Sequence, residues 1–269
     1  MSETMPRILI TNDDGIQSPG LAAVAAAVHD LGEILLVAPQ EQQTSMSRAR
    51  SQFGQHFGKY YKHSVQHKEK SWHGIGIQCT PALCVNYAID EISPGPVDLV
   101  ISGINYGENI GTCVTVSGTI GAAIEAADRG IPAIAVSLEL NSTDYHSFDQ
   151  AIDFQAAMAF TRQFTIKALA GDFPDDVDIL KIEVPVDATP QTQWVLTRQD
   201  RIRYYAPHFI PRNDPYQQKA EITHTPQKKQ FISENTDAHA AAQGLVSVTP
   251  LSINLTSRTD FQQLEQILH

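Results

Sequence analysis

Two adjacent aspartates, Asp13 and Asp14, stand in the motif Asn-Asp-Asp-Gly, directly after the apolar residues 8–10. A short apolar run without helical spacing is typical of a buried strand of a parallel sheet. Gly15 gives the backbone the freedom to turn sharply where such a strand ends. Neighbouring carboxylates repel each other, and a bound cation relieves this repulsion. The pair therefore indicates a metal site, although a solvated turn rich in Asn, Asp and Gly has the same composition.

Two further polar loops follow apolar strands in the same way. Residues 33–38 predict a strand that runs into the polar segment 40–47, and residues 97–101 predict a third strand before the long loop 102–117. In a doubly wound parallel sheet such loops all leave from the carboxyl edge, where ligands bind. Oxygen atoms from the three loops can therefore meet, and the candidate donors are Asp13, Asp14, Thr44 or Ser45, and Asn105 or Asn109.

This donor set consists of oxygen atoms only and carries two negative charges. It suits Mg²⁺ or Mn²⁺, which keep water molecules among their ligands, better than zinc. Next to it, Ser117, Gly118 and Thr119 open a predicted helix. The free N–H groups and positive end of a helix favour an anion such as phosphate, while a simple N-cap is the alternative role for these residues. A metal site beside an anion-binding helix end predicts a site for phosphate esters.

The order of the predicted elements indicates an α/β fold with a Rossmann-like, mainly parallel sheet flanked by helices. We expect this core to span residues 1–170, with a helix over 148–169 and an irregular excursion or hairpin over 46–72. Residues 171–269 predict a smaller C-terminal region for oligomerisation, part of which returns to the core. It contains strands over 178–184 and 245–255, the latter at an edge because of Pro250, a hairpin with arms near 193–205 and 228–232, and a short terminal helix.

Composition excludes some partners. The 269 residues carry a net charge of −11, so we expect no binding to nucleic-acid polymers or to anionic membranes. The chain has no apolar run of about 18 residues and no basic-then-apolar start, and we expect a soluble, cytoplasmic protein. Three cysteines without Cys-x-x-Cys spacing predict neither a disulfide framework nor a zinc site.

Four blocks of sequence, over roughly residues 5–140, read MPRILITNDDGIQSPG, VAPQEQQTSMS, DLVISGINYGENIG and SGTIGAAIEAADRGIPAIAVSL. Together they resemble the SurE (survival protein E) family of metal-dependent nucleotidases, and VSVTPLSINLT resembles the family's C-terminal strand. The resemblance implies hydrolysis of nucleoside 5′- or 3′-monophosphates with a divalent cation. It also implies a homodimer or homotetramer in which the hairpin and the tail reach across to partner subunits.

The resemblance assigns roles to individual residues. It implies that Asp13, Asp14, Thr44 and Asn105 bind the metal, and that Asn12, Asn109, Ser117, Gly118 and Thr119 surround the phosphate. Ser45 could replace Thr44, and Asn109 could merely stabilise its turn. Asp13 or Asp14 could act as base or as nucleophile. We favour attack by a water molecule that the cation activates, because both carboxylates are needed as ligands.

The loop 40–47 departs from the family pattern. Common members read Ala-Pro-Asp-Arg-Asn-Arg-Ser-Gly-Ala-Ser, whereas this chain reads Ala-Pro-Gln-Glu-Gln-Gln-Thr-Ser-Met-Ser. Arg48 and Arg50 could restore some of the lost positive charge, or belong to a solvated loop. Two alternatives to a nucleotidase stay open: a non-catalytic nucleotide-binding protein of the same fold, and a phosphatase for a non-nucleotide or polyphosphate substrate. A phosphoaspartyl phosphatase would need an Asp-x-Asp motif at the end of a strand, and no predicted strand here ends in one. A redox enzyme would need a Gly-x-Gly-x-x-Gly motif after a strand, and this motif does not follow any predicted strand either.

Overall fold

The computed structural model describes residues 5–140, 152–171, 173–226 and 233–269. Its strands are β1 (Arg7–Thr11), β2 (Glu33–Pro39), β3 (Tyr60–His67), β4 (Lys70–Ile77), β5 (Leu99–Tyr106), β6 (Ala133–Leu138), β7 (Ile179–Val184), β8 (Trp194–Leu196), β9 (Tyr205–Phe209), β10 (Ile222–Pro226) and β11 (Val246–Leu251). Its α-helices are α1 (Pro19–Val28), α2 (Pro81–Tyr87), α3 (Gly118–Ala127), α4 (Gln155–Leu169), α5 (Asp237–Ala242) and α6 (Phe261–Leu268).

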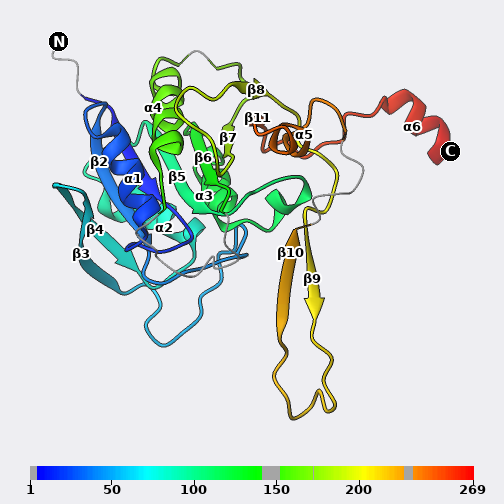
Figure 1. Ribbon diagram of the computed structural model, residues 1–269, viewed down its shortest axis with the longest axis horizontal. Helices are drawn as coiled ribbons and strands as arrows, with labels where there is room; N and C mark the ends of the chain where they lie inside the picture. Colours follow the sequence, from blue (N-terminus) through cyan, green and yellow to red (C-terminus); the bar gives the residue numbers. More distant parts are fainter. Residues whose placement is uncertain (1–4, 141–151, 172, 227–232) are drawn as a thin grey trace.

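One mixed sheet organises the described part of the chain. Its strand order is β3-β4-β2-β1-β5-β6-β7-β11-β8, and the central strands β2, β1, β5, β6 and β7 are parallel to one another. The strands β3 and β4 form an antiparallel hairpin at one edge. Of the two alternatives predicted for residues 46–72, the structure thus has the hairpin, but the hairpin extends to Ile77, beyond the predicted end. The predicted α/β fold with a mainly parallel sheet is thus confirmed (Figure 1).

Helices cover both faces of this sheet, and the side chains of β1 show why. Ile8 and Ile10 pack into the apolar layer beneath α1 and α4, whereas Leu9 packs into the layer beneath α2 and α3. The helices start where the sequence predicts, because Ser18, Thr80 and Ser117 each accept a backbone N–H as N-caps. β1 is therefore buried on both sides and fixes the place where its carboxyl end opens.

Several predicted boundaries were wrong. β5 continues to Tyr106, so the first residues of the predicted loop 102–117 are strand and pair with β6. The helix predicted over 148–169 begins only at Gln155, and residues 148–151 lie outside the described residues. The strand predicted over 245–255 ends at Leu251. The edge predicted at Pro250 is present, because this residue pairs with β7 alone, while β8 pairs only with Val246 to Val248.

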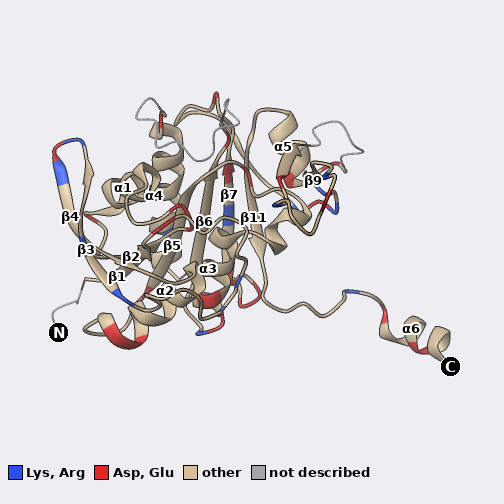
Figure 2. Ribbon diagram, turned by 90° about the horizontal axis from the view of Figure 1, so that it is seen from below, with Lys and Arg blue, Asp and Glu red and all other residues tan. Residues whose placement is uncertain are grey.

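The C-terminal region has two parts. β7, β11 and β8 extend the main sheet, while β9 and β10 pair as a separate antiparallel hairpin that projects from the body (Figure 1). The first hairpin arm was predicted over 193–205, and this was wrong, because β8 within that range joins the main sheet and the hairpin strand β9 begins only at Tyr205. The second hairpin arm, predicted over 228–232, lies outside the described residues. The predicted terminal helix is confirmed as α6, which extends away from the body in both views (Figure 2). No helix in the described ranges is long and apolar enough to cross a membrane.

Candidate active site

The turn after β1 is closed by Asn12. Its Oδ1 accepts the N–H of Gly15 at 3.1 Å and its Nδ2 donates to the carbonyl oxygen of the same residue at 3.1 Å. Gly15 has φ of +101°, a conformation that side chains disfavour. Asn12 thereby holds a tight turn whose two middle residues are Asp13 and Asp14.

Both aspartates are buried, with 4% and 3% of their surface exposed. Asp13 Oδ1 accepts the hydroxyl of Thr119 at 2.6 Å, and the two oxygens of Asp14 accept Gln42 Nε2 at 3.2 Å and the backbone N–H of Tyr106 at 3.3 Å. Within the described residues, neither carboxylate has an ion-pair partner. Burial therefore raises the pKa of Asp13 to about 6, and burial together with the charge of Asp13 raises the pKa of Asp14 well above its ordinary value.

The loop after β2 lies beside this pair, and its residues Thr44 and Ser45 line the same cavity as the two aspartates. The N–H of Gln43 donates to the carbonyl oxygen of Asp13 at 2.6 Å, and Ser47 is tied to the carbonyl oxygens of Thr115 and Val116. Ser45 and Ser47 adopt positive φ values of 63° and 50°. Such values cost free energy for residues other than glycine, and Ser45 stands where common members of the resembled family carry glycine.

Arg48 and Arg50 do not enter the site. Both donate hydrogen bonds to Glu125 on α3, whose side chain is 1% exposed, at distances of 2.7 to 3.1 Å. Asn86 donates to the same carboxylate at 2.8 Å. The two arginines therefore anchor the end of the Thr44 loop to α3. This role differs from the two that the sequence suggested, which were to restore positive charge at the site or to belong to a solvated loop.

Asn105 near the end of β5 and Asn109 in the loop that follows lie at the same edge. Asn105 Nδ2 donates to the carbonyl oxygen of Gly107 at 2.8 Å, so the amide carbonyl oxygen lies on the other side of the group. Asn109 Nδ2 donates to the hydroxyl of Ser137 at 2.9 Å. The Asn109 side chain is thus held by β6.

A buried charged network clamps the backbone of Asn109. Lys181 on β7 is fully buried, and its Nζ donates to the carbonyl oxygen of Asn109 and to Asp237 Oδ2, each at 2.8 Å. Glu183 Oε2 accepts the N–H of Asn109 at 3.0 Å, and burial raises the pKa of this carboxyl to about 7, although nearby Lys181 opposes the change. In Figure 2 the blue and red segments of β7 lie beside the tan strands β6 and β11.

A cavity of about 540 Å³ joins these groups. Of the residues that the sequence assigned to the site, it is lined by Asp13, Asp14, Thr44, Asn105, Asn109 and Ser117, together with the alternative Ser45. Asn12, Gly118 and Thr119 lie behind this lining: Asn12 closes the turn, and Gly118 and Thr119 lie against Asp13. A Cβ atom added at Gly118 would lie 2.7 Å from Asp13 Oδ2, so only glycine fits there.

Sequence reasoning missed the opposite part of the lining, which comes from the strands β9 and β10 and the residues before them. Arg203, Tyr205, Pro207 and His224 line the cavity, as does Glu108 from the loop after β5. The segment Arg-Tyr-Tyr combines aromatic and basic residues, which was the one local signal. Nothing in the sequence placed it beside the aspartates.

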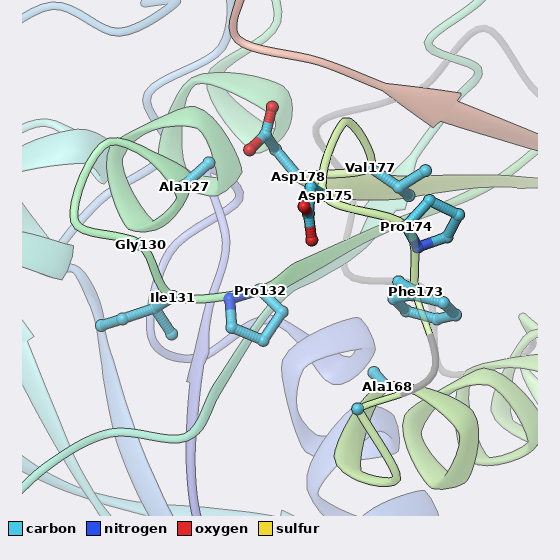
Figure 3. Close-up of a pocket in the computed structure, with 11 residues that line it drawn as sticks. Ala127, Gly130, Ile131, Pro132, Ala168, Phe173, Pro174, Asp175, Val177 and Asp178 are labelled. Atoms are coloured by element: carbon cyan, nitrogen blue, oxygen red, sulfur yellow. The ribbon is translucent and has the colours of Figure 1, made fainter.

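A second cavity, of about 360 Å³, lies at the other end of the sheet, where β6 and β7 begin (Figure 3). Its lining is mostly small and apolar, with Asp175 and Asp178 as its charged residues. Asp178 accepts the backbone N–H of Ile253 at 2.8 Å and so has a structural role. This cavity lacks the varied donors that distinguish the first one.

Comparison with known proteins decides the family. The family model described as survival protein SurE matches residues 8–206. This chain belongs to the SurE family. The predicted relationship is therefore confirmed, and with it the prediction of the fold.

Among SurE relatives, the 5′-nucleotidase SurE of Thermococcus gammatolerans is 38% identical over 97% of this chain and 96% of its own length. The 5′-nucleotidase SurE of Thermococcus kodakarensis is 37% identical over 97% and 98%. The crystal structure of the SurE protein from Aquifex aeolicus superposes with a TM-score of 0.74 at 28% identity, covering 98% of this chain and all of that one. The likeness thus extends over 97–98% of the chain and includes most of the C-terminal region.

The residues of this SurE site fit a hard divalent cation. Two buried carboxylates with no ion-pair partner among the described residues are destabilising by themselves, and a dication would neutralise both. The Asn105 carbonyl oxygen and the Thr44 hydroxyl add neutral oxygen donors at the cavity wall. The described part of the chain contains no cluster of three or more His, Cys, Asp or Glu that could hold a metal.

Proposed function

We propose that this SurE family protein is a divalent-metal-dependent phosphomonoesterase that hydrolyses nucleoside 5′- or 3′-monophosphates to nucleoside and phosphate. The observation that carries the proposal is the buried pair Asp13 and Asp14, which opens onto a cavity large enough for a small-molecule ligand. The printed names of the relatives, 5′-nucleotidase SurE, support the same substrate class.

The cation would be held by Asp13, Asp14, the hydroxyl of Thr44 and the side-chain oxygen of Asn105, and Mg²⁺ or Mn²⁺ suits these donors. When bound, it would neutralise phosphate charge and activate the attacking water. Thr119 donates to Asp13 Oδ1, and Oδ2 of that carboxylate would bind the cation. Asn12 keeps the turn closed so that both carboxylates face the cavity.

The phosphate would lie between these ligands and the start of α3. Ser117 Oγ accepts the N–H of Ile120 at 3.2 Å, so the hydroxyl hydrogen of Ser117 can donate to a phosphoryl oxygen at the cavity wall. Asn109, fixed by Ser137 and by the Lys181 network, would orient the phosphoryl group from the other side. In hydrolysis the ester P–O bond breaks, water supplies the new oxygen on phosphorus, and the nucleoside oxygen leaves with a proton.

Two finer features belong to this proposal. We infer a homodimer or homotetramer assembled through the hairpin β9–β10 and helix α6, because large apolar side chains such as Phe209, Ile222 and Leu268 are exposed there. Light scattering coupled to size-exclusion chromatography tests this, and a monomer at all concentrations would exclude it. We also infer a cytoplasmic location, which fractionation of cells that contain the protein would test.

A metal-by-substrate panel tests the function. Protein stripped with EDTA is given Mg²⁺, Mn²⁺, Ca²⁺ or Zn²⁺ together with AMP, 3′-AMP, ribose 5-phosphate or polyphosphate, and released phosphate is measured. We expect release from nucleotides with Mg²⁺ or Mn²⁺ and none for Asp13→Asn. The control is Asp30→Asn, an exposed aspartate paired with Arg162 away from the cavity. Nucleotide binding without phosphate release under any metal would mean a binding protein instead.

A further inference from the structure

The hairpin side of the cavity is built differently from the sheet side. The sheet side presents carboxylates, amides and hydroxyls, whereas Tyr205 and Pro207 of β9 and His224 of β10 present rings. Flat apolar and aromatic surfaces of this kind bind planar groups, while a phosphoryl group and its cation need the polar side. The two walls thus suit the two ends of one nucleotide.

Tyr205 is held firmly in this wall. Its hydroxyl donates to Glu108 Oε2, its backbone N–H donates to Cys113 Sγ at 3.2 Å, and its ring meets that of Tyr204 edge-to-face with centroids 5.1 Å apart. Glu108 is buried and also accepts the hydroxyl of Tyr204 at 2.8 Å. A ring fixed in advance loses little conformational entropy when a ligand stacks on it.

Glu108 also connects the two walls of the cavity. It is the residue before Asn109, so the carboxylate that fixes the Tyr205 ring and the amide proposed to orient the phosphoryl group belong to neighbouring residues of one loop. Both residues line the cavity. The separation between the phosphate end and the aromatic wall is therefore set by a short, hydrogen-bonded piece of backbone.

We propose that Tyr205 is the platform on which the nucleobase of the substrate stacks, and that Pro207 and His224 complete this base subsite. Tyr205 is accordingly a specificity-determining residue that makes the enzyme prefer nucleotides over phosphate esters without a base. The inference rests on the proposed function. Because stacking uses the π-face that all bases share, the subsite accepts purines and pyrimidines and discriminates only weakly between them.

Arg203 provides a matched control within the same wall. It is exposed at the cavity and carries the positive charge of that lining, so it acts on the charge that all phosphate esters share. Arg203→Gln should therefore lower kcat/KM for AMP and ribose 5-phosphate together. A substitution at the base subsite should change the two substrates unequally.

The experiment compares kcat/KM for AMP and for ribose 5-phosphate, which lacks the base, in wild type, Tyr205→Ala, Tyr205→Phe and Arg203→Gln. The ratio of the two values should fall about 5- to 150-fold in Tyr205→Ala, the range measured for losing one base–aromatic stack. Tyr205→Phe keeps the ring and loses only the bond to Glu108, so its ratio should stay within about threefold of wild type, as should that of Arg203→Gln.

If the ratio of kcat/KM for AMP to that for ribose 5-phosphate were unchanged in Tyr205→Ala, the base subsite would be overturned. It would also be overturned if this ratio fell as much in Tyr205→Phe, which keeps the ring, as in Tyr205→Ala. Calorimetric titration of each EDTA-stripped variant with AMP and with ribose 5-phosphate repeats the comparison without turnover, because no phosphate release is expected in the absence of the cation. If wild type released no phosphate, the proposed function would fail, and the ratio of the two dissociation constants would still accept or reject the stacking role of Tyr205.

Discussion

The carboxylate pair that would bind the cation should destabilise the protein when the cation is absent. Burial raises the pKa of Asp13 from 3.8 to about 6. The stability associated with the protonated carboxyl is then fully present below pH 3.8 and is lost as the pH rises through about 6. A tenfold change in proton affinity corresponds to about 1.4 kcal/mol, so the ionised group costs about 3 kcal/mol at pH 7.5 and about half of that at pH 5.

Asp13→Asn removes this cost and keeps an oxygen that can accept the Thr119 hydroxyl. In EDTA at pH 7.5 the variant should be more stable than wild type by up to about 3 kcal/mol, and the difference should shrink toward pH 5. Urea unfolding measures it. Mn²⁺ at about 1,000 times its dissociation constant should reverse the order, because it stabilises wild type by about 4.1 kcal/mol and stabilises the variant much less. The exposed control Asp30→Asn should show no increase in the free energy of unfolding in EDTA. If Asp13→Asn were the less stable protein in EDTA, the reasoning about the buried pair would be refuted.

Four further substitutions test other parts of the site. Lys181→Met leaves Asp237 without the ammonium group that lies 2.8 Å away, so urea unfolding should show a loss of about 3–5 kcal/mol; an unchanged midpoint would argue against the clamp. Ser45→Gly relieves a φ of +63° and should stabilise by about 1 kcal/mol in the same assay. With Thr44 as the hydroxyl ligand, Ser45→Gly should retain Mn²⁺-dependent turnover and Thr44→Val should lose it, whereas the opposite pattern would assign the ligand to Ser45. Gly118→Ala brings a Cβ within 2.7 Å of Asp13 Oδ2, so the Mn²⁺ concentration for half-maximal activity should rise by about tenfold or more, and an unchanged value would show that the carboxylate can move without harm.

The sheet side of the site could be predicted because its signals are local. β1 is an apolar run that ends abruptly in Asp13 and Asp14, and the capping residues Ser117 and Thr80 stand directly before their helices. β5 was predicted too short because Ser102, Gly103 and Asn105 are polar or flexible, although they continue a strand that is buried between β1 and β6. Burial by neighbouring strands overrides composition there.

The hairpin side of the site and the anchoring of the Thr44 loop could not be predicted, because both depend on contacts between distant parts of the chain. Arg48 and Arg50 look like solvated charges until Glu125 is seen to face them from α3. Tyr205 reaches the cavity only because the chain between β8 and β9 passes over the loop that carries Glu108. No periodicity within either segment encodes these partners.

The central claim is that Asp13, Asp14, Thr44 and Asn105 bind a cation that hydrolysis of nucleotides requires. Titration of EDTA-stripped protein with Mn²⁺, while phosphate release from AMP is followed, tests it most directly. The account predicts no release before Mn²⁺ is added, activity that saturates as the site fills, and no activity at any Mn²⁺ concentration for Asp13→Asn. Equal phosphate release by the stripped protein, or by Asp13→Asn, would contradict it.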